Sequence, residues 1–79
     1  MHVIEVLGPG CAKCQYVERV VREVVDGAGI TAEVRHVTDY GEIVSRGVIA
    51  TPGLVIDGRV VLAGRVPTRE QVAAWLGVA

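Results

Sequence analysis

Both cysteines of the chain lie in one short segment, residues 8–14, whose sequence is GPGCAKC. Cys11 and Cys14 are separated by two residues, and this spacing occurs in redox dithiols, in metal sites and in incidental pairs. In a dithiol one thiolate attacks a disulfide sulfur, whereas in a metal site the same thiolates act as ligands. The elements that position the two sulfurs must therefore decide between these three possibilities.

The composition limits the classes of protein to consider. The chain has 79 residues, of which 51% are hydrophobic, and a formal net charge of −1; this suits a single domain over residues 1–79. It has no basic stretch to support nucleic-acid binding, and no apolar run of the about 18 residues that a membrane span requires. The N-terminus lacks a secretion signal, so we expect a cytoplasmic protein. A permanent structural disulfide is uncommon there, which favours a chemical role for the cysteines.

The first third of the sequence alternates strand and helix signals. Residues 2–7 are mostly β-branched and apolar, as in a central strand buried on both faces. From about residue 12 to residue 26, apolar side chains recur at the spacing of an amphipathic helix, at Val17, Val20, Val21, Val24 and Val25. We expect Gly27 and Gly29 to end this helix.

A second strand and a short helix are expected next. Residues 31–37 alternate between apolar and polar side chains, as in a strand. Asp39 can cap a short helix, with Glu42 three residues further on. We expect Ile43 and Val44 on the buried side of this helix.

A hairpin and a final helix complete the chain. Residues 53–64 form two apolar runs joined by Asp57-Gly58, a strong turn signal. Thr68 and Gln71 have the spacing of a capping box before the last helix. The resulting order, β-α-β-α-β-β-α, predicts an α/β fold. Its four-stranded mixed sheet would have a parallel first pair, an antiparallel hairpin and helices on both faces.

In this layout the two cysteines lie where the first strand meets the first helix. Cys11 would stand at the helix N-terminus, where unpaired N–H groups and the helix dipole favour a thiolate. Lys13 adds a nearby positive charge. Cys14, three residues on and on the same side of the helix, is close enough to form a disulfide with Cys11. A C-x-x-C beside a β-α-β pattern favours redox chemistry.

A proline provides a further motif, because Thr51-Pro52 stands at the entry to the third strand although proline lacks the N–H that a central strand needs. Together with Cys11 and Cys14 after the first strand and Gly64 after the fourth, it makes the chain similar to the thioredoxin superfamily. The resemblance covers nearly all 79 residues. It is strongest to the small, glutaredoxin-sized thioredoxins of archaea and bacteria.

The resemblance implies a minimal thioredoxin-like fold and a thiol–disulfide oxidoreductase that needs no bound cofactor. Cys11 would attack a substrate disulfide and Cys14 would resolve the mixed disulfide. In the family a cis-proline loop lies opposite the C-x-x-C and contacts the substrate chain, which implies this role for Thr51 and Pro52, with Gly64 beside them. The implied partners are a protein disulfide and a recycling reductase. We expect a monomer that binds neither nucleic acid nor membrane.

Glu5 is unusual because it interrupts an apolar central strand six residues before Cys11. Thioredoxins carry a buried acid at that offset, which helps to move the proton of the second cysteine, here Cys14. Arg35 falls where those proteins place the lysine partner of the acid. The alternative is a structural ion pair. Burial would raise the pKa of Glu5 and Arg35 would lower it, and the sequence leaves both outcomes open.

Three other functions remain open. A small metallochaperone also places a C-x-x-C after its first strand, and two thiolates suit Cu(I). Such proteins usually follow a β-α-β-β-α-β order, whereas this chain is expected to end in a helix. A structural zinc site needs four ligands, and the chain has two cysteines. A thioredoxin-like module that serves one partner, without general reductase activity, is the third possibility.

Overall fold

The computed structural model describes residues 1–10 and 12–78. Four strands, β1 (His2–Leu7), β2 (Ala32–Val37), β3 (Gly53–Ile56) and β4 (Arg59–Ala63), form a mixed sheet in the order β2-β1-β3-β4. β1 pairs with β2 in parallel and with β3 antiparallel, and β3 pairs with β4 antiparallel. Three helices, α1 (Ala12–Ala28), α2 (Tyr40–Ser45) and α3 (Arg69–Leu76), complete the fold. The predicted fold class and element order are confirmed.

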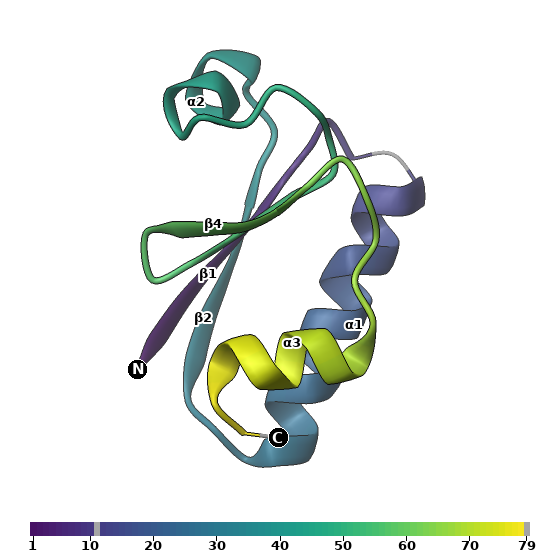
Figure 1. Cartoon of the computed structure of the whole chain (residues 1–79), viewed down its shortest axis with the longest axis vertical. Coiled ribbons are helices and arrows are strands. Elements are labelled where there is room, and N and C mark those ends of the chain that lie inside the picture. Colours follow the sequence, from purple (N-terminus) through teal and green to yellow (C-terminus); the bar gives the residue numbers. More distant parts are fainter. Residues whose placement is uncertain (11, 79) are drawn as a thin grey trace.

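The helices divide between the two faces of the sheet, as Figure 1 shows. Successive strand residues point to opposite faces. Ile4 and Val6 of β1 therefore belong to the larger core with α1 and α3. Leu7 faces the other way and joins a smaller cluster with Val37, Ile43, Val48 and Val55. Valine is a poor helix former, so the buried valines of α1 stabilise that helix through packing.

Two details of the helices differ from the expectations. α1 continues through Gly27 to Ala28, because a glycine in the last turn costs a helix only about 1 kcal/mol. In α2, Ile43 is fully buried but Val44 is 56% exposed. Neighbouring helix residues point about 100° apart, and the short α2 turns only one of the two toward the sheet.

The predicted caps and turn are confirmed. Asp39 accepts a hydrogen bond from the N–H of Glu42, and Thr68 and Gln71 form a reciprocal capping box. The hairpin turns at Asp57-Gly58, where both residues have positive φ angles, 52° and 82°. These angles suit the two-residue turn that the Asp-Gly pair predicts.

Asp57 also joins the hairpin to β1. Its Oδ1 accepts a hydrogen bond from the Val3 N–H at 2.8 Å, and its own N–H donates to the Val3 oxygen at 2.8 Å. Its Oδ2 lies 2.6 Å from Nδ1 of His2. The Val3 N–H, followed by His2, lowers the pKa of the Asp57 carboxyl below its ordinary value.

We expect Asp57→Asn to be less stable than the parent protein at neutral pH. The substitution keeps a residue that tolerates positive φ but removes the charge. Because the carboxyl pKa is depressed by folding, its stabilisation is present above the ordinary value of 3.8 and is lost as the pH falls through the folded-state pKa. Urea unfolding followed by circular dichroism should show the difference between the two proteins shrinking in acid. A difference in stability that stays constant with pH would show that the substitution acts through the turn and not through the charge of Asp57.

Candidate functional site

Three connecting segments meet at one end of the sheet. Leu7, the last residue of β1, pairs with Gly53, the first residue of β3, and Gly53 pairs with Ala63, the last residue of β4. The segments beyond this row are therefore neighbours in space, near the start of α1 (Figure 1). The N–H of Gly64, directly after β4, donates to the oxygen of Pro52, directly before β3, at 2.8 Å. This hydrogen bond joins two of the three segments.

Cys14 is the described cysteine, and it is fully buried in the first turns of α1. Its sulfur lies against Gly8, the residue that follows β1. A Cβ placed on Gly8 would stand 2.2 Å from Cys14 Sγ and 3.7 Å from Cβ of Thr51. The missing side chain of Gly8 therefore allows the sulfur to approach the end of the central strand, on the side where Thr51 lies.

The predicted cis peptide bond between Thr51 and Pro52 is confirmed. Pro52 is buried and Thr51 is partly exposed. Gly64 packs close to the same segment, since a Cβ on it would stand 3.0 Å from that of Ala50. Thus Cys14, Thr51, Pro52 and Gly64, which the sequence placed in one site, are brought to the same end of the sheet.

The roles predicted for two further site residues are not tested by the described structure. Cys11 lies outside the described residues, so its predicted place opposite Thr51 and at the helix N-terminus stays a prediction. Lys13 is an exposed residue in the first turn of α1. Its predicted influence on the Cys11 thiol also stays a prediction.

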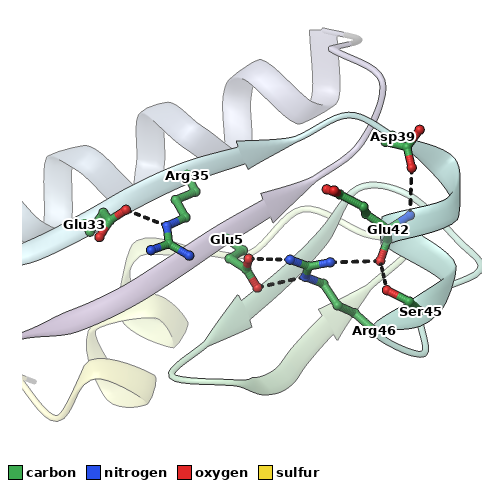
Figure 2. A network of polar contacts seen from close by, with 7 residues as sticks. All are labelled: Glu5, Glu33, Arg35, Asp39, Glu42, Ser45 and Arg46. Atoms are coloured by element: carbon green, nitrogen blue, oxygen red, sulfur yellow. Dashed lines mark hydrogen bonds and ion pairs between the residues drawn. The ribbon is translucent and has the colours of Figure 1, made fainter.

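Glu5 makes a bidentate ion pair with Arg46, the residue that caps the C-terminus of α2. Nε of Arg46 donates to Oε1 of Glu5 at 2.9 Å, and Nη2 donates to Oε2 at 2.8 Å. Figure 2 shows the two side chains meeting between β1 and α2. Glu5 is 12% exposed and Arg46 30% exposed, so water reaches the pair only in part.

The expectation that Arg35 is the partner of Glu5 is wrong. Arg35 stands beside Glu5 in the register of β1 and β2, but its guanidinium donates to Glu33 of its own strand (Figure 2). β2 is an edge strand, and there the exposed Arg35 side chain extends along its own strand. It acts on Glu5 only through its charge.

The ion pair also decides the direction of the Glu5 titration. The hydrogen bond from Arg46 lowers the carboxyl pKa, burial raises it, and the charges of Arg46 and Arg35 lower it further, with a net shift downward. Burial alone would raise the pKa of Glu5 and make it a proton acceptor near neutral pH. The two arginines outweigh this effect of burial. The lowered pKa favours the structural ion pair over the proton-transfer role.

Two residues of the site were missed from the sequence, Gly8 and Arg46. Gly8 directly follows a strong strand and precedes the C-x-x-C, and a close backbone approach could have been inferred from that position. Arg46 gives no local signal, because its partner Glu5 is 41 residues away.

Residues 1–10 and 12–78 contain no group of three or more His, Cys, Asp or Glu side chains that could hold a metal ion. Within the same residues, no helix is both long and apolar enough to cross a bilayer.

A mixed four-stranded sheet, a C-x-x-C motif whose second cysteine is buried in the first turn of α1, and a cis-proline before β3 define a minimal thioredoxin-like protein. The chain belongs to the thioredoxin family, since residues 2–77 match the family model described as thioredoxin domain. A protein named thioredoxin from Methanothermobacter thermautotrophicus is 39% identical over 72 residues, which cover 91% of this chain and 94% of the relative. Another, from Methanocaldococcus jannaschii, is 39% identical over 72 residues, covering 91% and 83%. This membership supports a thioredoxin-like redox function in general terms.

The contact between Gly8 and Cys14 can be tested by Gly8→Ala. The added methyl group would overlap the sulfur, so we expect a loss of about 1–3 kcal/mol in the free energy of unfolding. Gly27→Ala is the matched control, because a Cβ there meets no described atom within 4 Å and should stabilise α1 by up to about 1 kcal/mol. Thermal unfolding measures both. Equal stability of the parent and Gly8→Ala would contradict the close approach of the sulfur.

Proposed function

We propose that this protein is a thiol–disulfide oxidoreductase that reduces disulfides in other proteins with Cys11 and Cys14. The observation that carries the proposal is the place of Cys14, which is buried against Gly8 and beside Thr51 at the end of the sheet. A buried thiol there is shielded from external disulfides. It can react with a sulfur that is brought to it on the neighbouring turn, and Cys11 precedes it by three residues.

The reaction has two exchange steps. In the first, the Cys11 thiolate attacks one sulfur of the substrate disulfide; the substrate S–S bond breaks, and the other substrate sulfur leaves as a thiolate that takes a proton from water. In the second, Cys14 attacks Cys11 and its proton passes to the departing substrate sulfur. The substrate gains two electrons as a dithiol, and the protein is left with a Cys11–Cys14 disulfide.

The neighbouring residues have supporting roles in this proposal. Thr51 and Pro52 form the surface that receives the substrate chain, with Gly64 at its border because it is bound to Pro52. Lys13 supplies positive charge on the first turn of α1, which favours the thiolate form of Cys11. A carboxylate with a lowered pKa is a weak base, so Glu5 is not given the proton of Cys14.

The proposed partners follow from the chemistry. The substrate is a protein disulfide, and a reductase must return two electrons to the Cys11–Cys14 disulfide after each turnover. A reducing compartment such as the cytoplasm suits this direction of electron flow, because thiols are kept reduced there.

Insulin reduction with dithiothreitol as the electron donor tests the proposal. The parent protein should accelerate the precipitation of the insulin B chain, and both Cys11→Ser and Cys14→Ser should lower the rate to the dithiothreitol background, since turnover needs both thiols. Iodoacetamide should modify Cys11 in the folded protein and Cys14 only after denaturation, because Cys14 is buried. Faster modification of Cys14 than of Cys11 would reverse the two roles, and undiminished insulin reduction by Cys11→Ser would refute the proposal.

A further inference from the structure

We propose that Arg46 is a positioning residue, which by its bidentate contact with Glu5 holds the start of the segment 47–52 in place at the candidate site. The inference rests on the proposed function, because this segment carries Thr51 and Pro52. We call residues 47–52 the proline loop.

Arg46 connects the end of α2 with the central strand β1. Its Nε and Nη2 donate to the two carboxylate oxygens of Glu5 on β1, and Nη1 donates to the oxygen of Glu42 in α2 at 3.0 Å. Its backbone N–H donates to the oxygen of Ile43 at 3.2 Å. The same residue therefore ends the helix and ties that end to the central strand (Figure 2).

The proline loop starts at the next residue, and further contacts continue from this anchor. The N–H of Gly47 donates to the Val44 oxygen at 2.9 Å, and the N–H of Val48 donates to the Ile43 oxygen at 3.3 Å. Val48 is buried, and its Cγ1 would stand 2.9 Å from a Cβ on Gly53. The position of the end of α2 therefore determines the position of the start of the proline loop.

The other end of the loop has its own anchor, the hydrogen bond from Gly64 to Pro52. Between the two anchors Ile49 is 92% exposed and Ala50 is exposed as well. An exposed segment held at both ends keeps one geometry when a substrate chain arrives, whereas one held at a single end must be ordered at binding. The Arg46 contact therefore matters for Thr51 although the two residues are five positions apart.

α2 needs a second attachment because it is short. It has six residues and a single buried side chain, Ile43, and so short a helix is marginal without tertiary contacts. A bidentate arginine–carboxylate pair fixes orientation as well as distance, which a single apolar contact does not. Because the Glu5–Arg46 pair is partly exposed, it contributes little to the overall stability of the protein. Its main effect is to fix the position of the proline loop.

The test compares Arg46→Gln and Glu5→Gln with the control Arg35→Gln. Each of the first two substitutions breaks the bidentate pair from a different side, whereas Arg35→Gln removes an arginine of the same sheet face that bonds to Glu33 and not to α2. Two rates are measured for each protein: reduction of insulin, which must lie along the proline loop, and reduction of the small disulfide dithiobisnitrobenzoate, which need not. Amide hydrogen exchange of residues 47–52 is measured alongside.

We expect the ratio of the insulin rate to the small-disulfide rate to fall about tenfold in Arg46→Gln and Glu5→Gln, as for a misplaced binding segment. Exchange of the loop amides should accelerate in the same two proteins, and neither quantity should change in Arg35→Gln. Arg46→Lys should recover part of the ratio, because an ammonium group keeps the charge but not the fork of donors.

An unchanged ratio with unchanged loop exchange in either variant would overturn the inference, as would an equal loss in Arg35→Gln. Should Arg46→Gln fail to fold, Glu5→Gln decides, since it leaves the arginine bond to Glu42 available. The exchange measurement needs no activity. An inactive parent protein whose variants still show faster loop exchange would therefore refute the proposed function and leave the anchoring role of Arg46 supported.

Discussion

The register of β3 between β1 and β4 is the constraint on which the candidate site depends. It places Leu7, Gly53 and Ala63 in one row, so that the segments beyond them are neighbours. A shift of one residue would turn every side chain of β1 to the opposite face. Glu5 would then enter the large core beside α1 and α3, at the cost of an unpaired buried charge. The alternation along β1 thus stabilises the register that assembles the site.

The two faces of the sheet are closed by different means. α1 and α3 cover one face with aliphatic side chains, whereas the six-residue α2 lies at one end of the other. The ion pairs of Glu5 with Arg46 and of Glu33 with Arg35 occupy the polar part of that second face (Figure 2). A carboxylate in the middle of a central strand is compatible with this face because an arginine from the helix end reaches both of its oxygens. The Glu5–Arg46 ion pair therefore attaches α2 to the sheet in this small fold. A larger apolar cluster would need a longer chain to do the same.

Local signals predicted most of the fold, because caps, turns and periodic apolar positions each depend on residues a few positions apart. The capping box at Thr68, the hairpin turn at Asp57-Gly58 and the proline site at Pro52 belong to this group. The contacts that shape the site are not local. The resemblance implies Arg35 as the partner of Glu5, whereas in the structure the partner is Arg46, whose reach depends on where α2 ends. The exposure of Val44 likewise depends on how α2 is rotated over the sheet.

The central claim is that Cys11 carries the covalent bond to the substrate and that the buried Cys14 releases it. The most direct measurement is mass spectrometry of the mixed disulfide formed when Cys14→Ser is mixed with a peptide that contains one disulfide. The account predicts a stable adduct in which the peptide is joined to Cys11, because no thiol remains to resolve it. Peptide-linked protein that forms with Cys11→Ser, through Cys14, would contradict the account.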